Sequence, residues 1–368
     1  VLVRGPALSQ TGYGEQCRFA LRALLSKPHV FDVFVQNTTW GNSSWLMPND
    51  PDREMIDKII RKTIKHAQDG GTFDISLQVT IPNEWEKICP VNIGYTAGIE
   101  TTKVAPLWIQ KSALMDKIIT ISNHSKDTFA NTVYSGTIRE TEEQVTVRCT
   151  TPIEVVHYPV RNHKATPLDI NLDFDFNYLA VAQWGPRKNL ENTIRWWIEE
   201  FKDEEVGLIV KTNLIKSSVI DREFTTERLQ VILSGYANRK CKVYLIHGYM
   251  TPEEMTGLYQ HDKVKCLVSL THGEGFGLPL FEAASSGLPI IAPPWSGHVD
   301  FLYAPKKRIK KHKTTIERTA CFAKVDYDIS PIPPEAVWKD VLQEGSMWCY
   351  PTKKSYQKQL RNVYENYN

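Results

Sequence analysis

The chain has 368 residues, of which 42% are hydrophobic and 23% charged, and its formal net charge is +2. These values are ordinary for soluble globular proteins, and they exclude a disordered chain and a strongly basic nucleic-acid-binding surface. A chain of this length predicts two domains, each able to bury its own core. No apolar run reaches the roughly eighteen residues of a membrane span, and the first residues lack a signal-peptide pattern.

Cysteine usage indicates a reducing compartment. The seven cysteines are scattered, odd in number and without a C-x-x-C pair. This pattern argues against a disulfide framework and against a structural zinc site. We therefore expect a cytoplasmic protein.

Strand-like runs alternate with helical segments through the first half of the chain. The expected strands are 2–4, 30–35, 75–79, 91–95, 117–121 and 153–157. A helix is expected over 15–26, because Cys17, Leu21 and Leu24 share one helical face. The polar, proline-containing segment 161–175 has no clear periodicity and is the expected linker.

The second half begins again with a buried strand at 178–182. Further strands are expected at 207–211, 242–246 and 266–270, with helices at 190–201 and 252–259. Alternation of this kind predicts an α/β fold with two Rossmann-like domains built on parallel sheets.

The most informative segment is 272–284, which places two carboxylates around a glycine-rich turn. Gly275 and Gly277 allow main chain to approach a ligand closely, and Pro279 is well placed as the first residue of a helix. The amino end of that helix favours a phosphate or diphosphate. A lone glycine turn of this kind is also compatible with an ordinary connection from strand to helix.

Seven residues separate the two carboxylates, Glu274 and Glu282, which are suited to accepting hydrogen bonds from sugar hydroxyls. The pattern continues into a second βα-type segment at 287–297. Together these residues resemble the family-4 type of retaining, nucleotide-sugar-dependent glycosyltransferases. The hallmark of that family is Glu-x7-Glu within E-G-F-G-L-P-x-x-E-A-x-x-x-G-x-P-x-I.

This resemblance implies the GT-B fold, in which two Rossmann-like domains face an interdomain cleft. Residues 1–165 would form the acceptor-side domain and residues 166–352 the nucleotide-sugar donor domain. A final helix, 353–368, would cross back to pack on the first domain.

The resemblance also implies roles for the residues of the motif. Glu274 would contact donor sugar hydroxyls and Glu282 the ribose. The diphosphate would be held by Lys188 together with four backbone amides, those of Gly275, Phe276, Gly277 and Leu278.

Lys188 matches a lysine of the family, but the arginine usually found at the end of the preceding strand is absent. Gln183 lies nearest to that position, and whether Arg187 substitutes for the arginine stays open. Fixed cations here would stabilise the negative charge that develops on a leaving diphosphate. Lys211 ends another strand and could add charge at the nucleotide; a solvated strand end is the alternative.

Two loops carry four further donor-binding candidates. Tyr249 and Met250 follow a strand where the family seats the nucleobase, although apolar packing explains them equally well. Gly12 and Gly14 lie between the first strand and the first helix, where the resemblance implies a loop over the donor diphosphate. A structural turn is the alternative for this pair.

The acceptor side is less well defined. Glu100 is the candidate acceptor-side base, because a carboxylate in a partly closed cleft can have a raised pKa; a buried structural carboxylate or a surface residue is the alternative. His298 could reach the cleft, whereas His124 is expected at a helix start capped by Ser122 or Asn123. The loop 38–45 contains two tryptophans that would either bind a glycan or pack inside the protein.

We expect a retaining glycosyltransferase, with an acceptor that is a glycan, a lipid-linked molecule or another hydroxyl compound. No metal or other cofactor is required by these motifs, and no nucleic acid is expected as a partner. The alternative is a catalytically silent subunit that binds sugar nucleotides. Epimerases lack the Glu-x7-Glu signature, and phosphorylases of similar architecture are much longer.

One dense cationic run, 306–313, stands apart from the near-neutral chain. A solvated loop explains it, and so does peripheral contact with an anionic membrane, an acidic glycan or the rim of a nucleotide-sugar site.

Overall fold

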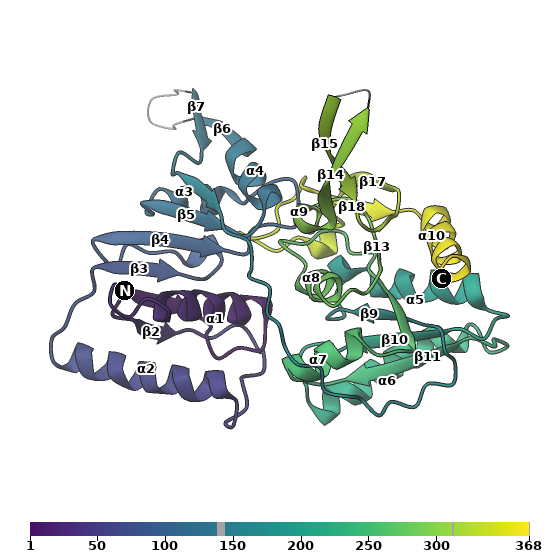
Figure 1. The fold of residues 1–368 in the computed structure, drawn as a ribbon. Helices are drawn as coiled ribbons and strands as arrows, with labels where there is room; N and C mark the ends of the chain where they lie inside the picture. Colours follow the sequence, from purple (N-terminus) through teal and green to yellow (C-terminus); the bar gives the residue numbers. More distant parts are fainter. Residues whose placement is uncertain (138–143, 311–312, 368) are drawn as a thin grey trace. The chain divides into compact units, whose positions relative to one another are not determined.

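The structure, a computed structural model, describes residues 1–137, 144–310 and 313–367. It divides into two compact units, which are named here unit 1 (Val1–Pro159 and Pro331–Met347) and unit 2 (Val160–Ser330 and Trp348–Asn368). Each unit has a six-stranded sheet in which every pair of neighbours is parallel (Figure 1). The expected α/β class with two Rossmann-like domains is thereby confirmed.

The sheet of unit 1 has the strand order β2-β1-β3-β4-β5-β8. Its strands are β1 (Leu2–Gly5), β2 (Phe34–Asn37), β3 (Ile75–Gln78), β4 (Val91–Thr96), β5 (Lys117–Thr120) and β8 (Ile153–Val155). The helices are α1 (Gly12–Leu25), α2 (Pro51–Gln68), α3 (Pro106–Ser112) and α4 (Asn123–Asn131), with short 3-10 turns η1 (Pro82–Glu84) and η3 (Pro334–Ala336). A separate hairpin joins β6 (Val133–Thr137) to β7 (Gln144–Arg148).

The sheet of unit 2 has the order β11-β10-β9-β12-β13-β16, the 3-2-1-4-5-6 arrangement of dinucleotide-binding domains. Its strands are β9 (Asn177–Val181), β10 (Gly207–Thr212), β11 (Lys242–His247), β12 (Val264–Val268), β13 (Ile290–Ala292) and β16 (Ala323–Lys324). The helical segments are η2 (Pro186–Lys188), α5 (Leu190–Phe201), α6 (Val219–Ser234), α7 (Pro252–Tyr259), α8 (Leu278–Ser285), α9 (Val299–Leu302) and α10 (Lys353–Glu365).

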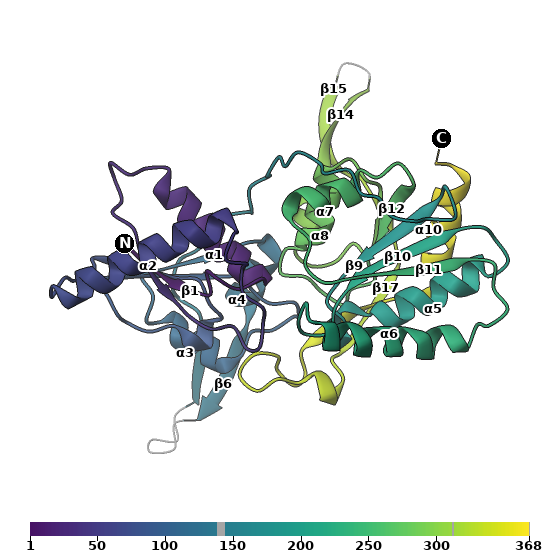
Figure 2. The ribbon, with the colours of Figure 1, turned by 90° about the horizontal axis from the view of Figure 1, so that it is seen from below.

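Helices cover both faces of the unit 2 sheet, α5 and α6 on one and α7 and α8 on the other (Figure 2). Alternate residues of each strand point to opposite faces. Tyr178 and Ala180 therefore pack among the side chains of α5 and α6, whereas Leu179 packs among those of α7 and α8. A strand buried on both faces must be apolar throughout, which explains the continuous hydrophobic run that marked β9 in the sequence.

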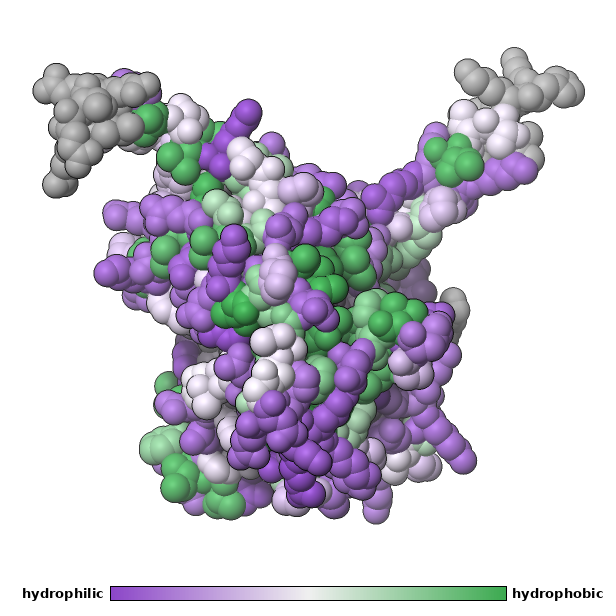
Figure 3. All heavy atoms as spheres, turned by 90° about the vertical axis from the view of Figure 1, so that its left-hand side faces the viewer, coloured by the Kyte–Doolittle hydropathy of each residue, from purple (hydrophilic) through white to green (hydrophobic). Residues whose placement is uncertain are grey.

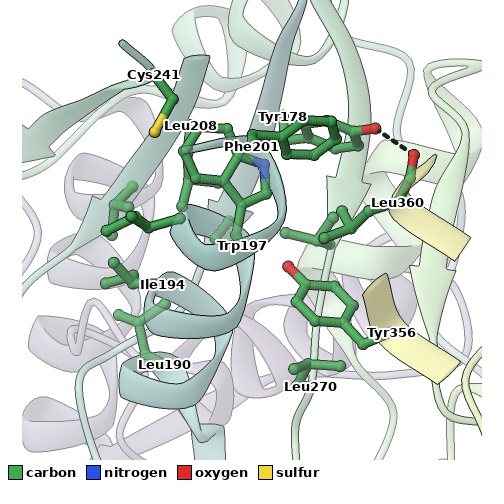
Figure 4. Close-up of a cluster of buried hydrophobic side chains, with 14 of the residues drawn as sticks. Tyr178, Leu190, Ile194, Trp197, Phe201, Leu208, Cys241, Leu270, Tyr356 and Leu360 are labelled. Atoms are coloured by element: carbon green, nitrogen blue, oxygen red, sulfur yellow. Dashed lines mark hydrogen bonds between the residues drawn. The ribbon is translucent and has the colours of Figure 1, made fainter. Parts of the chain in front are cut away.

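The final helix, α10, belongs to unit 2, and the expectation that it crosses back to the first domain is wrong. Tyr356 and Leu360 are fully buried in the core on the α5 side of the sheet (Figure 4). The hydroxyl of Tyr178 donates to the backbone carbonyl of Leu360 at 2.8 Å. Arg361 also pairs with Glu200 of α5 at 2.8 Å. These contacts fix the helix on the second sheet.

The segment 331–347 corrects the expected boundary in the opposite direction, because it lies in unit 1. Val341 and Leu342 pack in the apolar cluster around Trp108, and the backbone N–H of Met347 donates to Thr102 Oγ1 at 3.0 Å. The chain thus leaves unit 2 after Ser330 and returns at Trp348. The first crossing, at 159/160, falls six residues before the expected one.

Helices with strong local signals were predicted well, and strand ends less well. Helices α5 and α7 have the expected bounds, whereas α1 begins three residues early because Thr11 caps it, accepting from the N–H of Gly14. Strand β2 begins at Phe34 rather than Val30, because residues 27–31 form a turn closed by the carbonyl of Lys27. The sequence did not predict α2 or α6.

In the cationic run, residues 306–310 end β14 (Tyr303–Lys310) and residue 313 begins β15 (Lys313–Ala320), and the two strands pair as a hairpin, so the described part of the run is strand. Residues 311 and 312 lie outside the described residues, and of the run's side chains only those of Lys306 and Lys307 are described; both are exposed. A second small sheet pairs β17 (Tyr327–Pro331) with β18 (Met347–Pro351). Within the described residues, no helix is both long and apolar enough to cross a membrane. On the face drawn in Figure 3, hydrophilic side chains predominate around a limited apolar area.

Assignment of α10 to unit 2 predicts where a core mutation acts. Leu360→Ala should destabilise unit 2 by about 2–5 kcal/mol, because truncating a buried leucine leaves a cavity. Hydrogen–deuterium exchange should show faster exchange in β9 and α5 with unchanged exchange in β1 to β5. Lys358→Ala, on the exposed side of the same helix, is the matched control. Faster exchange confined to unit 1 would contradict the assignment.

Candidate active site

The order of strands in unit 2 creates a topological switch point between β9 and β12. The connection from β9 leads to β10 on one side, whereas β12 lies on the other side of β9. In open α/β sheets, ligands bind outside the carboxyl ends of the strands at such a switch point. The loops leaving β9 and β12 carry Lys188 and Glu274, so two residues predicted from the sequence meet at this position.

The loop after β12 forms a buried turn that leads into α8. Gly277 has a φ of 92°, a left-handed conformation that glycine adopts without strain, and it caps the helix at its amino end. A Cβ at this position would lie 3.2 Å from the Cβ of His298 and 3.0 Å from Leu280 Cδ1. The first N–H groups of α8 have no acceptor within the helix, and the positive end of its dipole lies at the turn.

Glu274 is a buried carboxylate held between two cations. Its Oε1 lies 2.6 Å from Lys188 Nζ, and its Oε2 lies 3.4 Å from an Arg187 guanidinium nitrogen. Burial alone would raise the pKa of Glu274, but the charges of Lys188 and Arg187 outweigh burial and lower that pKa to about 2. The carboxylate is therefore ionised at neutral pH, and the three side chains together carry a net charge of +1.

Backbone hydrogen bonds join the loops that carry these charges. The N–H of His272 donates to the carbonyl of Arg187 at 2.8 Å, and Arg187 donates from its guanidinium to the carbonyl of Gly273 at 2.5 Å. Asn189, which has a left-handed φ of 51°, donates from its side chain to the carbonyl of Leu270 at 3.1 Å. The cations are thus presented by a fixed loop.

A third loop, which follows β13, supports Glu274; the sequence placed this loop in the second βα-type segment but assigned it no contact with Glu274. The N–H of Glu274 donates to Ser296 Oγ at 2.8 Å, and the N–H of Gly297 donates to the carbonyl of Glu274 at 2.9 Å. A Cβ on Gly297 would lie only 2.0 Å from the carbonyl oxygen of Gly275, so no other residue fits without displacing the turn. The adjacent serine and glycine were the available sequence signal.

His298 and His272 lie against the same turn but are structural in their contacts. His298 is fully buried, and its Nε2 is 2.7 Å from the carbonyl of Pro293. Burial lowers its pKa, so the ring is neutral. His272 is 2.6 Å from the carbonyl of Cys349 through Nδ1 and stacks on Trp348. The two contacts of His272 were not evident from the sequence, because Trp348 and Cys349 are distant from it along the chain.

The second carboxylate of the motif has a different environment. Glu282 is exposed on α8 and accepts a hydrogen bond from the buried hydroxyl of Tyr259 at 3.1 Å. Burial is the main reason that the pKa of Tyr259 is raised, so this hydroxyl stays protonated and remains a donor. Glu274 is thus fixed by charge and Glu282 by a neutral donor.

Lys211 and the loop after β11 form a neighbouring group in unit 2. Lys211 donates from Nζ to the carbonyl of Gly248 at 2.5 Å, and burial lowers its pKa to about 8. Tyr249 is 40% exposed, whereas Met250 packs in the core beneath α7 and α8. Exposure therefore leaves Tyr249 able to meet a ligand, and Met250 has a packing role.

A buried contact between a histidine and an aspartate lies beside this loop and was not predicted from the sequence. His247 Nε2 lies 2.7 Å from Asp221 Oδ1, and Asp221 also accepts the backbone N–H groups of 214, 215 and 216. Burial opposes ionisation of Asp221, but these donors outweigh it and lower its pKa. The pair ties the loop after β10 to the end of β11.

The three candidates of unit 1 lie beside the carboxyl edge of its own sheet. Gly14 is buried, and a Cβ there would lie 2.0 Å from the carbonyl oxygen of Ser9, which makes its role one of packing. Gly12 is exposed, with open space where a Cβ would lie. Glu100 is half-buried in the loop after β4. Ser122 caps α4 as expected and accepts from the N–H of Ser125, which places His124 in the first turn of that helix.

Among known proteins, the chain is similar to several solved structures. A lipopolysaccharide outer core galactosyltransferase, WaaB, shares 14% identity over 81% of this chain and 82% of its own, with a TM-score of 0.48. OtsA shares 10% identity over 82% of this chain and 86% of its own, with a TM-score of 0.49. Anabaena Alr3699/HepE, solved in complex with UDP-glucose, shares 14% identity over 81% of this chain and 82% of its own, with a TM-score of 0.47. No family model and no curated protein matches the chain.

The charge on Glu274 predicts a specific dependence of stability on pH. Its pKa in the folded protein, about 2, is below the ordinary 4.5, so its stabilising effect is complete above pH 4.5 and is lost as the pH falls toward 2. Glu274→Gln should be less stable than the wild type at neutral pH, by on the order of 2 kcal/mol. Urea unfolding should show this difference shrinking between pH 4.5 and 2.5.

The matched control is Glu282→Gln, which removes an exposed carboxylate from the adjoining helix. Its stability should follow that of the wild type across the same pH range. A difference between Glu274→Gln and the wild type that stays constant down to pH 2.5 would contradict the assigned charge state.

Proposed function

We propose that this protein is a retaining glycosyltransferase of the GT-B type, which moves a sugar from a nucleoside diphosphate donor to an acceptor hydroxyl. The single observation that carries the proposal is the cluster of Lys188, Arg187 and Glu274 at the switch point of the unit 2 sheet. The sequence resemblance to family-4 glycosyltransferases supports the same reaction. The product would be a glycan or glycoconjugate.

The cluster is suited to a diphosphate. Two cations and one carboxylate leave one positive charge uncompensated, and the amino end of α8 adds a partial positive charge at the same turn. Lys188, Arg187 and the amides from Gly275 to Leu278 would hold the two phosphates. As the bond to the sugar breaks, these fixed groups stabilise the charge developing on the leaving oxygen.

Glu274 would then have two tasks. It holds Lys188 in place, and its remaining acceptor capacity would receive hydrogen bonds from hydroxyls of the donor sugar. Glu282, oriented by Tyr259, would accept from the ribose hydroxyls. Lys211 and Tyr249 would line the nucleoside side of the site.

Retention would follow from displacement on one face of the sugar. Glu274 is committed to two cations, so it is poorly suited to act as a nucleophile on the anomeric carbon. The acceptor hydroxyl would attack from the side that the diphosphate leaves, and a phosphate oxygen would take the hydroxyl proton. Glu100 is the candidate base if the acceptor needs one.

A first test identifies the donor. Thermal unfolding in the presence of UDP-, GDP-, ADP- and dTDP-sugars should raise the melting temperature for at least one of them, because a ligand that binds only the folded state stabilises it. If no nucleotide sugar raises the melting temperature, the proposed function is wrong. A shift without any release of nucleoside diphosphate would instead indicate a silent binding subunit.

A second test removes the cation that contacts Glu274. Lys188→Met should lower the rate of donor hydrolysis about 10²- to 10³-fold, the usual cost of losing one group that stabilises transition-state charge. Lys202→Met, at the exposed end of α5, is the matched control and should keep the wild-type rate. Hydrolysis that persists in the double variant Lys188→Ala, Glu274→Ala would refute the site.

The fixed cations also predict that the reaction needs no metal. Lys188 and Arg187 supply the charge that a divalent cation provides in other transferases, so EDTA should leave donor hydrolysis within about twofold of its untreated rate. Loss of activity that magnesium or manganese restores would show that the two cations are insufficient.

The location of the protein is a further part of the proposal. The cationic residues of 306–313, with Lys306 and Lys307 exposed on β14, would hold a cytoplasmic enzyme against an anionic membrane surface. Binding to vesicles with and without phosphatidylserine at increasing salt concentration would measure this contact.

A further inference from the structure

The two tryptophans of the loop after β2 have different environments. Trp40 is half-buried and stacks on Tyr13, with ring centroids 4.3 Å apart and an angle of 30° between the rings. Trp45 is 46% exposed. The first tryptophan therefore packs inside unit 1, and the second presents a large apolar surface to solvent.

The position of this loop is fixed by the loop that follows β1. The N–H of Gln10 donates to the carbonyl of Ser44, and the N–H of Leu46 donates to the carbonyl of Leu8, both at 2.8 Å. These two bonds flank Trp45 on either side. Both loops leave the carboxyl ends of their strands, so Trp45 lies on the edge of the sheet where α/β domains present ligands.

The indole of Trp45 is itself oriented. The guanidinium carbon of Arg53 lies over the ring, 5.9 Å from its centroid, and the side chain still keeps 46% of its surface exposed. Arg53 is held by Asp57 at 3.0 Å and donates to the carbonyl of Leu46 at 3.3 Å. An exposed aromatic ring fixed in this way loses little conformational entropy when a ligand stacks on it.

The composition around Trp45 favours one class of ligand. The thirteen residues 37–49 include no charged side chain, and exposed hydrogen-bonding groups there come from Thr39, Asn42 and Asn49. The charge of Arg53 is compensated by Asp57. Neutral donors and acceptors beside an aromatic face suit a sugar ring, whereas an anionic lipid surface or a polyanion would require uncompensated cations.

We infer that unit 1 carries a carbohydrate-binding subsite in which a sugar ring stacks on Trp45 and its hydroxyls are bound by the neutral side chains of 37–49. Its role as the acceptor site, which would make the acceptor a glycan, rests on the proposed function. The binding of a carbohydrate by unit 1 does not.

The test uses the full chain and an array of immobilised oligosaccharides. The wild type should bind at least one glycan, and Trp45→Ala should weaken that binding at least tenfold. Trp45→Phe keeps an aromatic face and should stay within about threefold of the wild type. The matched control is Trp338→Ala, since Trp338 is a 58% exposed tryptophan of the same unit, in a segment with charged neighbours.

Melting temperatures of all variants should stay close to that of the wild type, because each tryptophan has about half of its surface exposed. Absence of glycan binding by the wild type, or equal binding by Trp45→Ala, would overturn the inference. Loss of neutral-vesicle binding in Trp45→Ala without any glycan binding would identify a lipid contact instead. Glycan binding that persists in a chain without donor hydrolysis would refute only the proposed reaction.

Discussion

The contact between Lys188 and Glu274 organises the carboxyl edge of unit 2. A buried carboxylate is costly unless it is paired, so the turn after β12 is stable only with the loop after β9 in place. The two loops come from neighbouring strands on either side of the switch point. Because Glu274 holds the two cations in fixed positions, the site is electrostatically preorganised, and its side chains need to move little when a phosphate binds.

Close backbone packing gives this contact its geometry. Gly277 turns the chain into α8 with a positive φ, and Gly297 allows the loop after β13 to touch the carbonyl of Gly275. Ser296 then satisfies the N–H of Glu274. Three successive connections of the sheet thus converge on one carboxylate. The site depends on the registration of β9, β12 and β13 more than on any single loop.

Unit 1 illustrates how identical residues are given different roles by packing. Trp40 lies against Tyr13, which in turn bonds Thr96 at the end of β4 and so links the first helix to the sheet. Trp45, five residues later, is held by backbone bonds on both sides while its ring remains exposed. A short segment therefore contributes one side chain to the core and one to the surface.

Much of the fold was predictable from the sequence because its signals are local. The bounds of α5 and α7 follow from helical periodicity, and the turn before α8 follows from its glycines and Pro279. Strand ends were less accurate: β12 begins and ends two residues before the expected positions, because the ends of a strand are set by the partners with which it pairs. The placement of α10 was wrong, since its amphipathic pattern indicates a buried face but not which sheet covers it.

For the candidate site, the sequence by itself determined the residue types, their spacing and their place after parallel strands. Only the tertiary structure decided that Glu274 is buried between Lys188 and Arg187 while Glu282 is exposed beside Tyr259. It also decided that Asp221 and His247 form a pair and that Trp45 is the exposed tryptophan of its loop. The physical reason is that charge pairing and burial depend on groups brought together by strand order, whereas sequence patterns report only neighbours along the chain.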